Sequence, residues 1–410
     1  WRDGGGLFDA GELTLSLQHH DEERDRLRTR RRRDLQGFSL DDLGALGRIE
    51  SESAVGRISW GFEAHHERVS SFRKNFKAGV FTGANVQGPV GDDASYDTVA
   101  AYVQDEVDAG DGFHLVPGVR ATHARLHANR VANPKASGPK VIGISDDWNA
   151  VVGSVRALYD LTEESRLFAG VSQGFRAPSL SDETSFNTTS VVERPSPGLD
   201  PERFIQFEIG SKGRTPEFEW QTSLFHTLIR NLIVQSPNGK FVGATPVVRK
   251  DSIGDGWVQG AEAALNWHVD SDWSVFGATS WTNGEVDQIF FPASGRGRRV
   301  RAPLSRLAPF QGTAGVRWQP EDRTWWIEGS AWAVNNQDRL ALRDRTDTTR
   351  IPPGGTPGFT LFDVAAGWTV GPRTRMTLSI QNLGDRDYRV HGSGLNGPGR
   401  NLVITVEVRF

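Results

Sequence analysis

Alternation of apolar and polar residues is the dominant pattern along this chain, and it is clearest at the C-terminus. Leu402, Ile404, Val406, Val408 and Phe410 alternate with neighbours that are mostly polar. A repeat of two places alternate side chains on opposite faces of a strand, so the pattern predicts a strand with one apolar face. Such a strand needs an apolar medium on one side, which either a second sheet or membrane lipid can supply. The tail alone leaves both possibilities open.

Similar alternation recurs along the chain, and the connections between the predicted strands are of two kinds. Short connections rich in turn residues lie at 109–112, 162–165, 212–216, 270–272, 320–323 and 371–373. Long connections span 71–95, 129–147, 177–201, 237–254, 288–302, 344–358 and 391–400. Short and long connections alternate in order, as they must in an up-and-down barrel whose turns lie at one rim and loops at the other. We therefore predict an all-β, antiparallel up-and-down transmembrane β-barrel of about sixteen strands, with long extracellular loops and short periplasmic turns.

Composition is consistent with a barrel and argues against a helical membrane protein. The 410 residues are 37% hydrophobic, with a mean hydropathy of -0.45. No segment approaches the roughly 20 consecutive apolar residues of a membrane-spanning helix. The 13 Trp and 22 Phe residues would suit aromatic girdles at the two membrane interfaces. The sequence begins at Trp1 without Met or a signal-peptide pattern, so we expect the chain to be a fragment or a processed piece.

Two arginine-rich segments are candidates for contact with anions. The first runs from Arg24 to Arg33, and the second contains Arg296, Arg298 and Arg299. No aromatic residues accompany the first run, so nucleic acid is not a predicted partner. The guanidinium group is always charged and matches carboxylate and phosphate oxygens. These arginines either attract an anionic ligand to the barrel mouth or contact outer-membrane lipids and lipopolysaccharide, and the sequence leaves both hypotheses open.

Three segments carry a resemblance to a known family. The first is Phe175, Arg176, Ala177 and Pro178, which resembles the FRAP signature of TonB-dependent outer-membrane receptors. The second, Pro197 to Glu202, is similar to the element that follows it in that family and includes Leu199, Pro201 and Glu202. The third contains Asn382, Leu383 and the terminal Phe410, and it resembles the C-terminal box of the family. The three segments occur in the expected order.

The resemblance implies a function in transport. Residues 1–410 would form the C-terminal portion of a receptor barrel in the outer membrane, with the N-terminal plug and first strands missing. Such a receptor takes up a scarce nutrient, here a ferric siderophore or other iron chelate, with energy supplied by the TonB–ExbB–ExbD complex. A haem or other nutrient receptor of the same family and a passive porin are the alternatives. Haem receptors carry a histidine between the first two motifs, whereas 179–196 contains none.

Catalytic and metal chemistry are not predicted. The chain has no cysteine, no Gly-x-Ser-x-Gly elbow and no His-Glu-x-x-His motif. The adjacent pairs His19–His20 and His65–His66 would point to opposite faces of a strand, so neither pair can hold one metal ion. We expect no cofactor and no enzyme activity, although an enzyme on the barrel rim is a further alternative. Arg176 and His391 are added to the basic loops as candidate ligand-binding residues.

Overall fold

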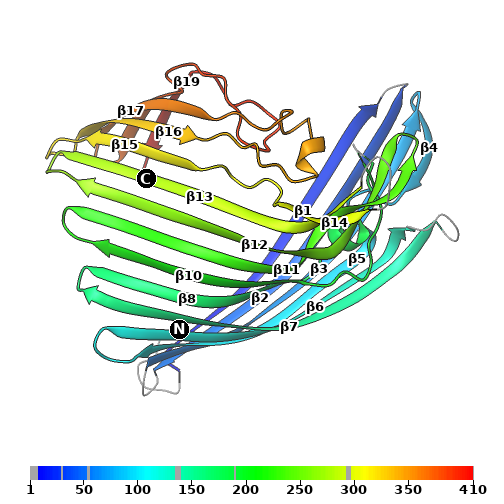
Figure 1. Ribbon diagram of the computed structural model, residues 1–410, viewed down its shortest axis with the longest axis horizontal. Helices are drawn as coiled ribbons and strands as arrows, with labels where there is room; N and C mark the ends of the chain where they lie inside the picture. The colour runs from blue at the N-terminus through cyan, green and yellow to red at the C-terminus, as the bar shows by residue number, and fades with distance from the viewer. Residues whose placement is uncertain are drawn as a thin grey trace.

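The computed structural model describes residues 8–28, 31–52, 56–133, 140–188, 191–291 and 297–409, nearly all of them in β-strands (Figure 1). Nineteen strands are present in this part of the chain, and setting aside three with six residues or fewer leaves the sixteen that were predicted. These wall strands are β1 (Ala10–Arg28), β2 (Arg32–Glu52), β3 (Gly56–Lys77), β5 (Asp92–Asp108), β6 (Phe113–Ala132), β7 (Val141–Thr162), β8 (Ser165–Arg176), β10 (Glu202–Arg214), β11 (Phe218–Val242), β12 (Thr245–His268), β13 (Trp273–Phe290), β15 (Gln311–Trp318), β16 (Trp325–Val334), β17 (Phe359–Gly371), β18 (Thr374–Gln381) and β19 (Asn401–Val408).

The remaining elements are short and lie in the connections. They are the strands β4 (Val80–Asn85), β9 (Val192–Glu193) and β14 (Arg298–Pro303), the helix α1 (Leu180–Thr184) and the 3-10 turn η1 (Asp344–Thr346). In the described chain no helix is long and apolar enough to cross a membrane.

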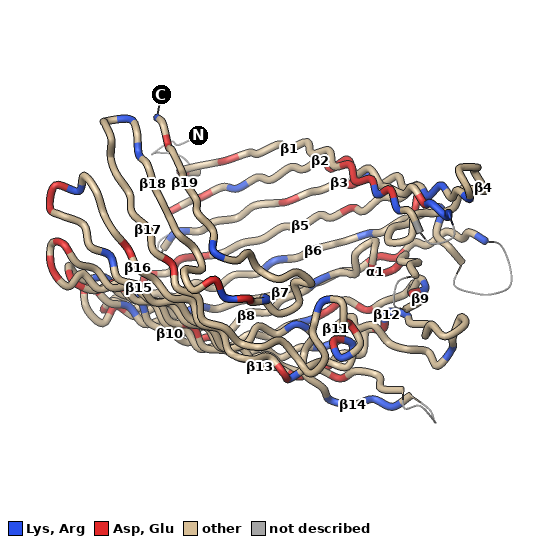
Figure 2. Tube along the Cα trace, turned by 90° about the horizontal axis from the view of Figure 1, so that it is seen from above, with Lys and Arg blue, Asp and Glu red and all other residues tan. Residues whose placement is uncertain are grey.

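Each wall strand pairs antiparallel with the next wall strand along the chain, from β1–β2 to β18–β19. The result is one deeply curved sheet, seen from two directions in Figures 1 and 2. This up-and-down order confirms the predicted fold class. Within the described residues β1 pairs only with β2 and β19 only with β18, so these two strands are the edges of the sheet.

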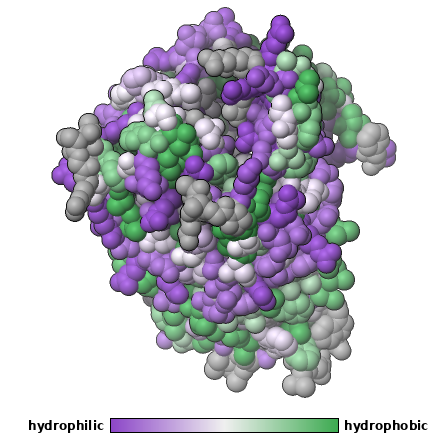
Figure 3. Space-filling model, turned by 90° about the vertical axis from the view of Figure 1, so that its right-hand side faces the viewer, coloured by the Kyte–Doolittle hydropathy of each residue, from purple (hydrophilic) through white to green (hydrophobic). Residues whose placement is uncertain are grey.

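Connection lengths separate the two rims of the sheet. The predicted short turns follow β5, β7, β10, β12, β15 and β17 and lie together at the left of Figure 1. A hydrogen bond of 2.8 Å from Thr369 N to Thr324 O joins the end of β17 to the turn after β15, so two of these turns are on the same rim, as predicted. The long connections lie at the opposite rim, and Figure 3, which faces that side, shows a surface rich in hydrophilic residues.

Three of the predicted long loops are wrong. Loop 71–95 consists largely of strand, because β3 continues to Lys77, β4 occupies Val80–Asn85 and β5 begins at Asp92. Strands β11 and β12 continue through 237–254 and are joined only by Gly243 and Ala244, with Gly243 at a φ of 63°. Likewise, β6 extends to Ala132 and β7 begins at Val141, inside the predicted loop 129–147. The physical reason is that these hairpins project past the apolar band. Strands that project into water need no apolar face, so they lack the alternation on which the prediction relied.

The apolar side chains of the wall strands face outward. Leu402, Ile404, Val406 and Val408 are 60%, 63%, 54% and 48% exposed, and Leu13, Leu15 and Leu17 on β1 are 65%, 71% and 79% exposed. We call this convex side the outer face and the concave side the inner face. The predicted orientation of the last strand is therefore confirmed for its described residues, whereas Phe410 lies outside them. An outward apolar band with a polar lumen is the signature of a membrane barrel.

Aromatic residues form a girdle on the outer face near the short turns. Trp273, Trp318 and Trp325 follow one another across neighbouring strands, with ring centres 6.5 Å and 4.6 Å apart. Phe218 and Trp267 stack at 5.6 Å farther round the sheet. Tryptophan prefers the interface between lipid and water, so this row marks one edge of the membrane.

Candidate functional site: the long-loop mouth of the barrel

The first family-like motif forms the anchor of an inward-folded loop. This β8–β10 loop comprises residues 177–201 and includes α1 and β9. Arg176, the last residue of β8, makes a bidentate ion pair with Glu202, the first residue of β10, with both N–O distances 2.6 Å. A third bond of 2.8 Å runs from Arg176 to Asp182 in α1. The guanidinium group therefore closes the base of the loop, and Arg176 is a structural clamp in this arrangement.

Buried carboxylates hold the loop from within. Glu183 is fully buried, and its two oxygens accept hydrogen bonds from Leu199 N at 2.9 Å and Gly198 N at 3.1 Å. Burial, together with nearby Asp146, raises the pKa of Glu183 to about 8. Burial alone would also raise the pKa of Asp182, but Lys250 and Arg176 outweigh it and lower that pKa to about 2.

The β8–β10 loop packs on the inner face of the wall rather than extending into solvent. Leu180 joins a buried cluster with Leu126 and Trp148, which come from β6 and β7. Trp148 Nε1 donates to Leu199 O at 2.9 Å, and the Tyr96 hydroxyl donates to Pro178 O at 3.1 Å. Pro178 of the first motif and Leu199 of the second thus fix the loop to the wall, and the loop narrows the mouth on that side.

Three further connections interlock on the other side of the mouth. Asp344 of the β16–β17 connection is buried and accepts from Ser305 Oγ at 2.7 Å and from Arg306 N at 2.9 Å. His391 of the β18–β19 connection is joined to Thr356 by a hydrogen bond of 2.8 Å. Burial lowers the pKa of His391, so this ring is held neutral. Its position between two connections gives His391 a clear structural contact.

The C-terminal motif also makes hydrogen bonds that hold a connection together. Asn382 is buried at the start of the β18–β19 connection and donates to Arg386 O at 2.8 Å and to Pro398 O at 3.2 Å. Its own side-chain oxygen accepts from Arg386 N at 2.9 Å. Leu383, the next residue, is exposed. Asn382 therefore ties both ends of this connection together.

Strand register decides which face each arginine of the second basic segment occupies. Arg301 pairs with Asp287 of β13. Asp287 lies on the same face of β13 as the exposed Trp281, which is the outer face, so Arg301 is also on the outer face. Arg299 is two residues away and shares this face. Both guanidinium groups bond Asp287, at 2.9 Å from Arg299 Nε and 2.7 Å from Arg301 Nε. The outer position of Arg299 favours membrane contact over ligand contact at that residue.

The other candidate arginines are arranged differently. Arg298 alternates with Arg299 and so points to the inner side, with its guanidinium 5.6 Å from the ring centre of Phe290. Arg296 lies outside the described residues. In the first basic run, Arg26 bonds Asp34 at 3.1 Å, and Arg33 Nε bonds Asp25 at 2.7 Å across the β1–β2 hairpin. Part of the positive charge of that run is therefore neutralised locally.

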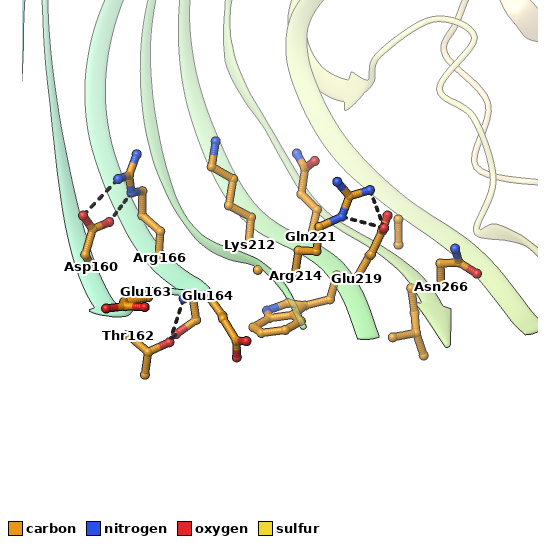
Figure 4. A pocket seen from close by; sticks show the side chains of 15 residues that line it. Asp160, Thr162, Glu163, Glu164, Arg166, Lys212, Arg214, Glu219, Gln221 and Asn266 are labelled. Atoms are coloured by element: carbon orange, nitrogen blue, oxygen red, sulfur yellow. Dashed lines mark hydrogen bonds and ion pairs between the residues drawn. The ribbon is translucent and has the colours of Figure 1, made fainter. Parts of the chain in front are cut away.

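The inner face also carries a polar groove near the short turns (Figure 4). Its volume is about 640 Å³, and its wall includes Asp160, Arg166, Lys212, Glu219, Gln221 and Asn266. Arg166 pairs with Asp160, with Nη2 to Oδ2 at 3.0 Å. Lys212 lies between Arg166 and Gln221 in register and has no carboxylate partner in the described chain. Polar side chains along the whole inner face fit a wet lumen. Among the described residues no cluster of His, Asp and Glu could hold a metal ion.

A curved up-and-down sheet with an apolar outer face, an aromatic girdle and a polar lumen defines an outer-membrane β-barrel. Residues 3–383 match the family model described as TonB dependent receptor-like, beta-barrel, and the chain belongs to this family. It therefore lies in the cell outer membrane, as predicted.

Relatives and solved structures agree with this assignment. The chain is 23% identical over 296 residues to the hemoglobin-haptoglobin utilization protein B of Neisseria meningitidis serogroup C, covering 61% of this chain and 36% of that protein. It is 25% identical over 343 residues to the pesticin receptor of Yersinia pestis, covering 77% and 44%. The solved copper transporter OprC superposes with a TM-score of 0.81 at 15% identity, covering 100% of this chain and 64% of that one. The matches thus span about two fifths of these curated relatives.

Proposed function

We propose that this barrel is part of a TonB-dependent receptor that captures a ferric siderophore or other iron chelate and passes it into the periplasm. Several relatives support this proposal, among them the ferric aerobactin receptor of Klebsiella pneumoniae, which is 22% identical over 378 residues. The structural observation that supports it best is the shape of the mouth at the long-loop rim. Projecting hairpins extend this rim, and the inward-folded β8–β10 loop, anchored by the Arg176–Glu202 pair, narrows the opening.

Gating and energy supply belong to the same proposal. A barrel with at least sixteen wall strands would leak unless something filled its lumen, and large outer-membrane transporters have a plugged lumen. The relatives are more than twice as long as the stretch matched here, which supports a plug outside residues 1–410. Energy would reach the receptor through the TonB–ExbB–ExbD complex. Family members are receptors and transporters, and we propose no enzymatic step.

Binding measurements on the intact receptor test this proposal. Purified protein would be titrated with a panel of ferric hydroxamate, catecholate and carboxylate chelates, with haem as a separate arm. Quenching of tryptophan fluorescence reports each affinity, and the iron-free chelators serve as controls. We expect one ferric chelate to bind far more tightly than its iron-free form. Preference for haem would instead place the protein with the haem receptors, and lack of binding by every compound would contradict the proposal.

A further inference from the structure

Strand β4 has an open edge at the long-loop rim. It follows β3 through a two-residue turn at Ala78 and Gly79, whose φ angles of 49° and 84° suit a tight hairpin. From there β4 pairs with β3 and with no other strand in the described chain. Its other edge therefore presents a row of N–H and C=O groups that no described residue binds. Figure 1 shows β4 at the upper right, at the end of the projecting hairpins.

The sequence of β4 lacks the features that protect such an edge. Edge strands of soluble regions usually carry Lys, another charge or Pro, which discourage pairing with another chain. The six residues of β4, VFTGAN, contain none of these. Val80 and Phe81 are 68% and 55% exposed, and the ring centre of Phe81 lies 5.8 Å from that of Phe76 on β3. An uncharged edge with exposed apolar side chains is the surface that an extended polypeptide covers when it adds a strand to a sheet.

This edge lies well outside the membrane, so lipid does not cover it. The outer apolar band of β1 ends at Leu17, and the strand continues to Arg28, about 36 Å farther at 3.3 Å per residue. At a tilt of 45° this length still rises about 25 Å, whereas the headgroup layer adds only about 5–8 Å to the hydrocarbon core. The β3–β4 turn is fixed at that height, because Ala78 N donates to Arg31 O at 2.9 Å.

Cations without carboxylate partners lie beside the edge. Arg31 and Arg32 are at the tip of the β1–β2 hairpin, and Lys74 and Lys77 are on β3. Within the described part of the chain none of the four forms an ion pair, and Figure 2 shows Lys and Arg gathered next to β4. A strand added to the open edge would be two strand spacings, or about 10 Å, from β3. Carboxylates on that strand would be within reach of the long lysine side chains.

Other occupants fit this surface less well. An anionic polysaccharide or a nucleic acid would use the cations, but neither has the repeating N–H and C=O groups that pair with a strand edge. A second copy of this chain that paired β4 with β4 would bring Lys74 and Lys77 close to their own counterparts, and like charges across paired strands are destabilising. An acidic polypeptide in extended conformation uses the backbone edge, the apolar side chains and the cations together.

We propose that β4 is a docking site for an extended, acidic segment of a protein partner, which adds as a strand to the open edge. Main-chain hydrogen bonds supply the affinity, and alternate side chains of the added strand supply the selectivity. Lys74 and Lys77 are three residues apart on β3, so they attract carboxylates on opposite faces of the added strand. The site depends on the extracellular position of the long-loop rim and is independent of the transported ligand.

Hydrogen exchange of the intact receptor tests this site with a defined probe. The probe is a capped six-residue peptide in which glutamate and valine alternate. We expect the outward amides of Val80–Asn85 to exchange rapidly in the free receptor and to slow when the peptide is added. The same peptide with every second amide N-methylated cannot donate hydrogen bonds along one edge. It should bind at least about tenfold more weakly, because several hydrogen bonds are lost.

A charge-reversed variant tests the role of the cations without altering β4. Lys74→Glu with Lys77→Glu should weaken binding of the glutamate peptide by about tenfold or more and favour a peptide in which lysine and valine alternate. Both effects should shrink as salt is raised, because the charges are exposed and screened. Lys240→Glu is the matched control, since Lys240 is an exposed lysine on the separate β11–β12 hairpin. This control should bind the glutamate peptide as the unaltered receptor does.

Three outcomes would overturn the proposal. Slow exchange throughout β4 in the free receptor would show that another part of the protein already covers the edge. Equal binding of the N-methylated peptide would show that the backbone edge is not used. Stronger binding of alginate than of the glutamate peptide would show a site for anionic polysaccharide. Chelate affinity should be unchanged in the lysine variant, so a failure here is distinguishable from a failure of the receptor function.

Discussion

Removing Glu202 should release the β8–β10 loop from the barrel wall. Glu202 is buried, and it accepts two bonds of 2.6 Å from Arg176 and one of 2.9 Å from Ile233 N. Loss of one partner from a fully buried ion pair costs about 3–5 kcal/mol. Arg176 is partly exposed and retains Asp182, so we expect Glu202→Ala to cost about 2 kcal/mol. That energy corresponds to about a 30-fold rise in the open population of the loop.

Hydrogen exchange followed by mass spectrometry measures this opening. The amides of Gly198 and Leu199 are bonded to Glu183 and report on the closed loop. Their exchange in Glu202→Ala should be faster by about the same factor as the open population. Glu328→Ala is the matched control, because it removes an arginine-paired glutamate from the distant strand β16. Unchanged exchange in Glu202→Ala would refute the view that the Arg176–Glu202 pair closes the loop.

Three further predictions concern other parts of the barrel. The pKa of Glu183 is raised from 4.5 to about 8, so the contribution of its protonated form to loop stability is present below about pH 4.5 and is lost as pH rises through 8. Hydrogen exchange of 177–201, corrected for its intrinsic pH dependence, should therefore accelerate over that range. Glu183→Gln should abolish this pH dependence. Replacing Arg296 and Arg298 by Ser should weaken uptake of the chelate at limiting concentration, more so at low salt, whereas replacing the outer pair Arg299 and Arg301 should not; equal effects would contradict the assignment of faces. Deleting Phe410 should lower the amount of heat-modifiable barrel in outer-membrane fractions, and an unchanged amount would argue against a role of this residue in assembly.

The period of the apolar residues predicted the strands and the apolar face of β19, and the alternation of short and long connections predicted the barrel. Leu402, Ile404, Val406 and Val408 must contact lipid, and the requirement for an apolar surface on alternate residues is written directly in the sequence. The ends of the extracellular hairpins were not predictable in this way. Beyond the membrane both faces are wet, so 237–254 has strand structure without strand alternation.

The mouth shows a second limit of sequence reasoning. Arg176 looks like a candidate ligand residue because it is a charged residue in a family-like motif. Its partners Glu202 and Asp182 are separated from it by 26 and 6 residues, and only the folded loop brings the three together. The sequence also does not give the strand register that assigns each residue to a face. Arg298 and Arg299 are adjacent in sequence but face opposite sides of the sheet. Arg203 and Arg230 show the same limit, because they become neighbours only through the pairing of β10 with β11.

Energised uptake is the measurement that tests the receptor function most directly. Cells that lack the native protein would be supplied with the intact receptor, and transport of radiolabelled iron would be followed with the chelate that binds best to the purified protein. We predict saturable uptake at nanomolar chelate that stops when a protonophore collapses the inner-membrane gradient or when TonB is absent. Uptake that continues under both conditions and rises linearly with concentration would show a passive porin and contradict this account.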